Sequence, residues 1–271
     1  MRLTDVSIER NFLYNVGFSE RRLQKLQDQA SSGKIFSRPQ DDPLGVQRSI
    51  LLRHQLAETT QYLRNLDRAR SWMEHVEVGL GQVTAALERV YELAISAATD
   101  TTPKDAREAV AMEIEEIMDE IESIKALKIE DKQVLVGDIP TWNVGDGVSV
   151  TADDQESLFT GIATHLQALV DALRADPPDA GAVKATIDPI SQDLEAVLSA
   201  RAKNGARIHR LDALESKLQG LDIEFKRLLS NVEDVDLTEV LVKLKSAEAS
   251  YQAALGAGAR LIQPTLLDYL R

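Results

Sequence analysis

The sequence has no cysteine, few aromatic residues and no long apolar run. The absence of cysteine excludes disulfide bonds, thiol catalysis and metal sites with cysteine ligands. No apolar run approaches the roughly 18 residues that a membrane-spanning helix needs. The N-terminal residues 1–6 show no apolar stretch with a small-residue cleavage site, so we do not expect a Sec-type signal peptide.

Acidic residues outnumber basic ones, 44 to 31, and they are unevenly distributed. The formal net charge is −13, and residues 101–200 contain 21 acidic and 7 basic side chains, a net of −14. A nucleic acid or an anionic membrane would require a basic face, so neither is an expected partner. We interpret the acidic middle as a solvated outer face that keeps the protein soluble.

Apolar residues recur with helical spacing at both ends of the chain. Steps of four and three residues produce a narrow apolar seam, which is stable only against another helix. We expect the two seams to pair with each other, with a partner chain or with both, as in an assembly protein. The N-terminal seam contains Phe12, Val16, Leu23 and Leu26, and the C-terminal seam contains Val240, Leu244, Ala247, Tyr251 and Leu261. Gly258 is a gap in the C-terminal row, where a small residue allows close helix approach.

The same spacing predicts long helices between the two ends. The first helix should end at Gly33, and Asp42 should cap the next one, with Pro43 at its first position. The Thr101–Pro103 segment should break that second helix. The expected helices span about 5–31, 43–98, 104–129, 156–174 and 181 onward, with a terminal helix that starts at Leu237 after a joint over 231–236.

Residues typical of β-strands are confined to the middle of the chain. Short strands are expected over 133–136 and 147–151. The order of elements is nearly palindromic, which predicts paired outermost helices, a bundle inside them and an insertion at the far tip. Deleting an insertion at the tip should leave the bundle folded. The expected divisions are a terminal helix and joint (1–40), bundle helices (41–130), a small outer insertion (131–180), bundle helices (181–232) and a C-terminal helix (233–271).

No pattern in the sequence supports catalysis, so we predict no catalytic, cofactor-binding or metal-binding residues and no enzyme activity. The four histidines match neither the Glu-x-x-His nor the His-Glu-x-x-His spacing of metal sites: His54, His75, His165 and His209. The acidic residues over 113–122 alternate with an isoleucine seam and are expected to face solvent. Asp41 and Asp42 are interpreted as a helix start rather than as paired catalytic carboxylates.

Two segments resemble a known family. Residues 31–45 read Ser-Ser-Gly-Lys-Ile-Phe-Ser-Arg-Pro-Gln-Asp-Asp-Pro-Leu-Gly, which resembles the link between terminal helix and bundle in bacterial flagellins and hook-associated proteins. The C-terminal stretch 223–258 and the ending Leu-Asp-Tyr-Leu at 267–270 are also similar to that family. The joint residues in this resemblance are Gly33, Pro39, Asp41, Asp42 and Pro43. Their Asp-Asp-Pro form is more similar to hook–filament junction proteins (hook-associated protein 3) than to filament flagellin.

The resemblance implies a fold and a function. The expected fold is mainly α, an elongated flagellin-like bundle with coiled-coil helices, paired terminal helices and a small β-containing insertion. The implied function is a secreted structural subunit of the flagellum at the hook–filament junction, contributing to motility and assembling into a helical layer. Its implied partners are itself, an adjacent hook-associated protein, flagellin, and an export chaperone on the C-terminal helix. Its implied route is flagellar type III export.

Two alternatives stay open at this point. The first is a short filament flagellin, which differs in copy number rather than in architecture. The second is an intracellular coiled-coil adaptor or sensor bundle, which would be found in the cytosol and not in sheared flagella.

Overall fold

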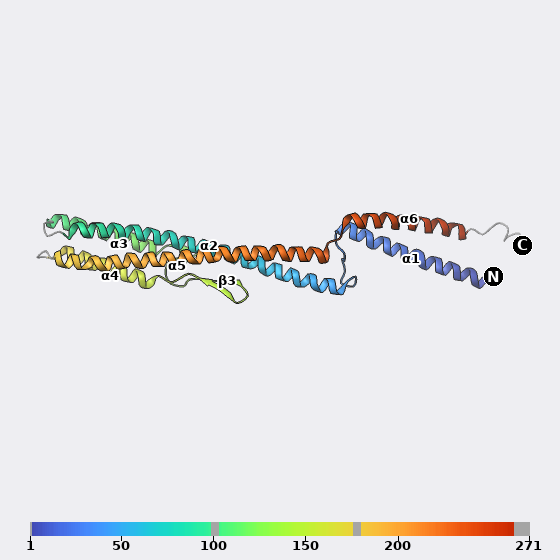
Figure 1. Cartoon of the computed structure of the whole chain (residues 1–271), viewed down its shortest axis with the longest axis horizontal. Coiled ribbons are helices and arrows are strands. Elements are labelled where there is room, and N and C mark those ends of the chain that lie inside the picture. Colours follow the sequence, from blue (N-terminus) through green and yellow to red (C-terminus); the bar gives the residue numbers. More distant parts are fainter. Residues whose placement is uncertain (1, 99–102, 176–179, 263–271) are drawn as a thin grey trace. The chain divides into compact units, whose positions relative to one another are not determined.

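The computed structural model describes the backbone of residues 2–98, 103–175 and 180–262, and these residues are mainly α-helical (Figure 1). The helices are α1 (Arg2–Ser32), α2 (Pro43–Ala97), α3 (Lys104–Lys125), α4 (Glu156–Arg174), α5 (Ala180–Glu233) and α6 (Leu237–Ile262). Four short strands lie between α3 and α4: β1 (Lys128–Ile129), β2 (Lys132–Gln133), β3 (Thr141–Gly145) and β4 (Val148–Thr151). The mainly helical class and a small β-containing insertion are confirmed.

The chain divides into two compact units. The bundle unit comprises Glu58–Leu221, and the terminal unit comprises Met1–Ala57 with Asp222–Arg271. The long helices α2 and α5 contribute to both units. Among the described residues, no helix has an apolar stretch long enough to cross a membrane.

The bundle unit has one large apolar core shared by four helices. The spacing of α2 places Leu80 and Leu87 on one face, and both side chains are completely buried. They belong to the same apolar cluster as Ile114 of α3, Ile162 of α4 and Ile190 of α5. Each helix therefore buries its apolar stripe against the others, which is the arrangement that stabilises a helical bundle.

Helix α4 is part of this core, which corrects the expected division of the chain. The sequence predicts a small outer insertion over residues 131–180. The side chains of Phe159, Leu166 and Leu169 in α4 are at most 3% exposed, and they lie in the four-helix cluster. An apolar stripe that recurs every three or four residues needs a partner surface, and the neighbouring helices supply it.

The β-rich segment also differs from its expected place at the tip. Strands β3 and β4 form an antiparallel hairpin, with Trp142 opposite Val150. The hairpin residues Val144 and Val150 are buried in a cluster with Met73 of α2 and Leu211 of α5. The hairpin is therefore packed on the long helices α2 and α5 of the bundle unit. The prediction of an insertion at the far tip is wrong for this hairpin.

The two tryptophans of the chain meet in this packing. The ring centroids of Trp142 in β3 and Trp72 in α2 are 5.7 Å apart, and the two ring planes form an angle of 57°. The Trp72 side chain is buried, at 6% exposure. A tilted aromatic pair adds about 0.5–1.5 kcal/mol beyond the buried area, so the contact fixes the hairpin on α2.

The expected strand over 147–151 is present as β4, whereas the other strands differ from the expected range of 133–136. Strands β1 and β2 pair antiparallel over two residues each, from Lys128 to Gln133. Residues 134–136, expected as strand, form no strand but are buried against the bundle. Their apolar character therefore reflects burial of a loop rather than a strand.

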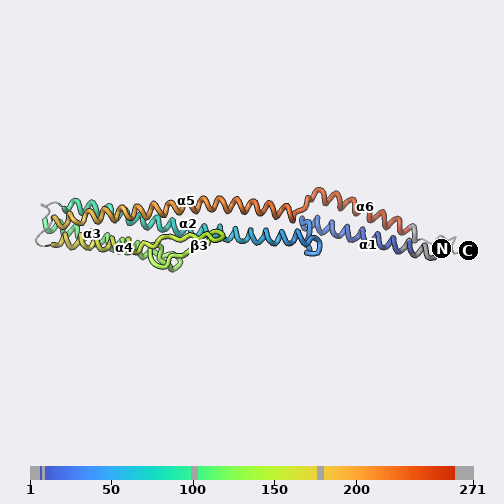
Figure 2. The backbone as a smooth tube through the Cα atoms, turned by 60° about the horizontal axis from the view of Figure 1, so that its bottom comes forward, coloured from blue at the N-terminus to red at the C-terminus, as the bar shows by residue number. Residues whose placement is uncertain are grey.

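In the terminal unit, α1 and α6 lie side by side in both views (Figures 1 and 2). The expected pairing of the first and last helices is therefore present within one chain.

Candidate assembly site at the terminal helices and their joint

The α1–α6 pair uses the two seams that the spacing indicated, but it buries little of them. Leu26 of α1 and Val240 of α6 are buried, at 8% and 3% exposure. The remaining described seam residues are only partly buried: Phe12, Val16, Leu23, Leu244, Ala247 and Tyr251. The side chain of Leu261 lies outside the described residues. One pair of helices thus covers its seams incompletely.

Gly258 marks a close approach of the two helices. A side chain at this position would overlap the ring of Phe12, which lies directly against the glycine. The gap in the C-terminal seam is thus filled by an aromatic side chain from α1. The interpretation of Gly258 as a small residue for close helix packing agrees with this geometry.

Further apolar side chains of the pair are exposed. Side chains on α1 and α6 that lie off the seams are 45–69% exposed: Leu13, Tyr14, Phe18, Leu241, Val242 and Leu255. Large apolar side chains gathered on one small unit mark an interaction surface more often than a solvated one. The terminal unit therefore offers more apolar surface than it covers.

The end of α1 follows the glycine signal in the sequence. Gly33 has φ +68°, in the left-handed region that favours glycine, and its N–H donates to the carbonyl of Gln29 at 2.9 Å. The Gln29 side chain in turn donates to the carbonyl of Ile35 at 2.7 Å. The expected conformation of Gly33 is confirmed, and it turns the chain out of α1.

The start of α2 follows the Asp-Pro signal. The Asp42 carboxylate accepts a hydrogen bond from the N–H of Gly45 at 3.0 Å, and Pro43 is the first residue of the helix. The predicted cap is confirmed. Asp41, in the exposed turn that also contains Pro39, accepts a hydrogen bond from the N–H of Arg38 at 3.1 Å.

Gly45 is a requirement of this turn that the sequence alone did not reveal. A Cβ atom at residue 45 would overlap the Asp42 carboxylate and lie 2.8 Å from the ring of Phe36. Any larger residue would have to displace either the cap or the aromatic ring.

A backbone clip joins the two segments that connect the terminal helices to α2 and α5. The N–H of Ile35 donates to the carbonyl of Glu233 at 2.7 Å, and the N–H of Val235 donates to the carbonyl of Gly33 at 3.0 Å. Lys34 and Asp234 form an antiparallel bridge between these bonds. The segment 33–35 after α1 and the segment 233–235 at the end of α5 are therefore held together.

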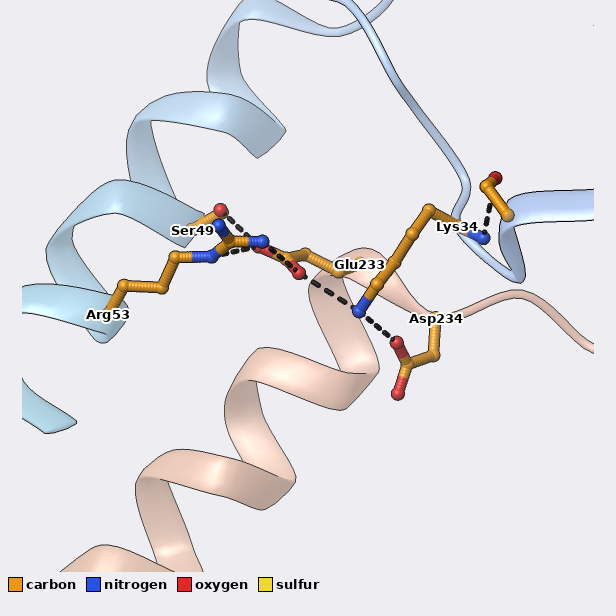
Figure 3. Close-up of polar contacts among 6 residues, drawn as sticks. Lys34, Ser49, Arg53, Glu233 and Asp234 are labelled. Atoms are coloured by element: carbon orange, nitrogen blue, oxygen red, sulfur yellow. Dashed lines mark hydrogen bonds and ion pairs between the residues drawn. The ribbon is translucent and has the colours of Figure 1, made fainter. Parts of the chain in front are cut away.

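A cluster of charged side chains, which we call the joint cluster, lies directly on this clip (Figure 3). The buried carboxylate of Glu233 accepts two hydrogen bonds from the Arg53 guanidinium, at 2.9 and 2.8 Å. It also accepts hydrogen bonds from the Ser49 hydroxyl and, at 3.1 Å, from the Lys34 ammonium. The Lys34 ammonium donates to Asp234 as well, at 2.7 Å. The joint cluster thus connects α2, the end of α5 and the clip.

The electrostatics of the joint cluster favour its ionised form. Hydrogen bonds from Arg53, then from Ser49 and Lys34, lower the pKa of Glu233 to about 2 in spite of its burial. Contacts with Asp234 and Glu233 raise the pKa of Lys34, and the Lys34 ammonium lowers the pKa of Asp234. The Glu233 side chain of this pair is 3% exposed and that of Arg53 is 62% exposed, so only the carboxylate is withdrawn from water. Two parallel hydrogen bonds from a guanidinium to a carboxylate are among the stronger polar contacts in proteins.

Sequence reasoning located the joint but missed the residues that hold it together. Ser49 and Arg53 lie on one face of α2, four residues apart, and face a carboxylate 180 residues away in the chain. The sequence did contain one indication of the cluster. Lys34 and the acidic pair Glu233–Asp234, which carry opposite charges, fall inside the two predicted joints.

The acidic residues over 113–122 and the histidines His165 and His209 belong to the bundle unit. The acidic residues of α3 are partly paired; Glu113 contacts Arg89, and Glu115 contacts Arg174. His165 lies 2.7 Å from Asp193, and His209 is exposed. Among the described residues, no group of three histidine, aspartate or glutamate side chains is placed to hold a metal ion.

Comparisons with known proteins agree with this architecture. The model of the bacterial flagellin N-terminal helical region matches residues 7–133. Flagellin of Halalkalibacterium halodurans is 28% identical over 262 residues, which cover 95% of each chain. Flagellar hook-associated protein 3 of Salmonella typhimurium is 21% identical over 300 residues, covering 94% of this chain and 95% of that protein.

A solved structure shares the fold. A flagellar hook-associated protein from Vibrio parahaemolyticus aligns with a TM-score of 0.65 at 18% identity, covering 72% of this chain and 100% of that chain. Paired terminal helices, a glycine-ended joint and a helical bundle define a flagellar structural subunit as the class of protein. The chain is similar to proteins of the flagellin-like family, including its hook-associated members. The relatives are structural components of the flagellum and not enzymes.

Proposed function

We propose that this protein is the structural subunit at the junction of hook and filament. The observation that carries the proposal is the terminal unit, in which two short helices cover each other incompletely and expose further apolar side chains. Such a unit gains stability when neighbouring copies cover its free faces. A repeated head-to-tail contact whose rotation does not close produces a helical layer.

The choice of junction over filament rests on the joint. It reads Asp41-Asp42-Pro43, with the proline at the first position of α2, and this form resembles junction proteins more than filament flagellin. The alignment with hook-associated protein 3 of Salmonella typhimurium, which extends over almost the whole of both chains, is compatible with this choice. The neighbouring proteins would then be another hook-associated protein on one side and flagellin on the other.

A short filament flagellin is the second candidate, and a specific observation favours it. The flagellin of Halalkalibacterium halodurans is 28% identical over 95% of each chain, a higher identity than that of the hook-associated relative. The two candidates share every contact described above. They differ in how many copies one flagellum contains and in where those copies lie.

Copy number therefore tests the proposal. Sheared flagella from cells that express an epitope-tagged chain should carry the label as one short band at the hook end, equivalent to about one helical turn. Label along the entire filament would favour the flagellin candidate. Label confined to the cytosol would contradict both candidates.

Export is the second part of the proposal. We infer that the chain leaves the cell through the flagellar type III apparatus, with a chaperone on α6 before export. The exposed apolar face of α6 supports a chaperone contact, since Leu241, Val242 and Leu255 would otherwise favour premature assembly in the cytosol. Deleting a component of the flagellar export apparatus should retain the chain in the cell.

A further inference from the structure

A polar pocket lies beside the joint, in the terminal unit, with a cavity volume of about 290 Å³. Three exposed basic side chains line it: Arg21 and Lys25 from α1, and Arg38 from the turn before α2. Within the part of the chain that the structure describes, none of the three forms an ion pair with a carboxylate. The pocket is therefore a concave surface with unmatched positive charge.

Two carboxylates also line the pocket, Asp28 and Asp41. Asp41 is engaged with the backbone N–H of Arg38. Lys34, a further lining residue, is already matched by Glu233 and Asp234. The lining thus retains a positive excess and includes acidic groups, which disfavours a polyphosphate and suits a ligand with a few separate carboxylates.

The same chain carries such a ligand on α3. Glu116, Asp119 and Glu120 are exposed, and their spacing of three and four residues places them on one face of the helix. They have no basic partner among the described residues. The neighbouring acids of α3 differ, because Glu113 and Glu122 are matched by Arg89 and Lys125.

We propose that the pocket formed by Arg21, Lys25 and Arg38 binds the Glu116–Asp119–Glu120 face of α3 from a second copy of this chain. The two surfaces are different parts of the molecule, so the contact is heterologous and can repeat from subunit to subunit. The inference rests on the proposed function only in requiring self-assembly. Because both surfaces are exposed, the contact sets register and orientation and weakens as salt screens it.

Charge reversal on both sides tests the contact and shows whether it is intermolecular. The pocket variant carries Arg21→Glu and Arg38→Glu, and the α3 variant carries Glu116→Lys and Glu120→Lys. Each variant alone should raise the critical concentration for assembly by about tenfold or more, since like charges then face each other. An equimolar mixture should assemble as alternating copies, because each acidic surface again meets a basic one.

The controls separate this contact from general charge effects. The substitutions Arg68→Glu and Lys217→Glu reverse two exposed basic residues of the bundle unit that have no carboxylate partner among the described residues. Assembly of that chain should be unchanged. Normal assembly of the pocket and α3 variants, or a mixture that fails to assemble although both variants keep wild-type melting curves, would overturn the proposal.

A measurement on the wild-type chain tests the same contact without relying on variants that could fail to fold. Carbodiimide treatment of assembled protein should couple the Lys25 amine to a carboxylate at 116, 119 or 120, and mass spectrometry should find that peptide pair in the dimer band. Absence of this coupling in assembled protein would contradict the contact. Loss of assembly in a seam variant such as Leu244→Asp, together with normal assembly of the charge variants, would remove this inference and leave the proposed function intact.

Discussion

Apolar residues recur with the same helical spacing in the bundle unit and in the terminal unit, but their side chains are buried to different extents. In the bundle unit, Leu80, Leu87, Ile114 and Leu166 are at most 1% exposed and belong to one core. In α1 and α6, Leu26 and Val240 are the only apolar side chains classed as buried among those described. One unit supplies its own core, whereas the other has a seam that needs further neighbours.

The difference assigns separate roles to apolar and polar contacts. Burial of a large aliphatic side chain contributes about 1.5–3 kcal/mol, so the bundle core offsets the entropy of ordering its helices. The terminal helices have too little burial for that. The joint cluster instead fixes where α1 ends and where α6 begins, through the backbone clip and the buried Glu233 carboxylate. Along the rest of their length, α1 and α6 are expected to become stably helical when subunits assemble.

The largest effect should follow from a charge placed in the terminal seam. Leu244→Asp or Tyr251→Asp should abolish assembly and motility, because a carboxylate cannot be buried at a subunit contact without a partner. The melting temperature of the monomer should stay that of the wild type, since neither side chain belongs to the bundle core. Gln252→Asp, at an exposed position of the same helix, is the matched control. Motile cells carrying either seam variant would contradict the account.

Removing the hairpin should destabilise the bundle unit. Replacing residues 141–151 by a short flexible linker uncovers Met73 and Leu211, and we expect a loss of about 2–5 kcal/mol in the free energy of unfolding. Trp142→Ala should reproduce part of this loss, whereas Ser149→Ala on the exposed side of the hairpin should be neutral. Thermal melting followed by circular dichroism measures both. An unchanged melting curve after the deletion would restore the earlier view of a dispensable tip.

Acid should open the joint before it affects the bundle core. The folded pKa of Glu233, about 2, is below its ordinary value of 4.5, so the contribution of this group is complete above pH 4.5. It is lost as pH falls from 4.5 towards 2, and its size is up to about 3 kcal/mol. Amide exchange of Ile35 and Val235 reports on the clip directly. Their protection should fall in that range in the wild type.

The Glu233→Gln variant should lack this acid step and show weaker protection at neutral pH. Glu20→Gln, at an exposed position of α1, serves as the control and should behave as the wild type. A clip that opens in acid equally in both variants would show that Glu233 does not control it.

The smallest effect should come from the cap of α2. Asp42→Ala removes the acceptor for the N–H of Gly45 and should cost about 0.5–2 kcal/mol of local stability. Asp42→Asn should retain most of it, because an amide oxygen can accept the same bond. Exchange rates of the first turn of α2 distinguish these outcomes, and equal rates in all three proteins would exclude a capping role.

Local signals predicted the helix boundaries well. Asp42-Pro43 and Leu237 mark the starts of α2 and α6, and Gly33 follows the end of α1. These boundaries depend on the conformational preferences of single residues and on backbone N–H groups three positions away. Such information is present in a short stretch of sequence.

Contacts between distant segments could not be predicted in the same way. The pairing of Trp142 with Trp72 and the hydrogen bonds of Arg53 with Glu233 join residues far apart in the chain. Helical spacing shows which face of an element is apolar, but not which of several similar faces it will meet. For that reason the hairpin was placed at the tip and α4 was assigned to an outer insertion.

Hydrogen exchange of the dilute full-length monomer, followed by exchange of the assembled protein, tests the central comparison most directly. The account predicts strong protection of α3, α4 and the bundle parts of α2 and α5 in both samples. It predicts weak protection of α1 and α6 in the monomer and strong protection after assembly, when neighbouring copies cover both faces. Strong protection of α1 and α6 in the dilute monomer, unchanged by assembly, would show that the terminal helices are ordinary core and would contradict the account.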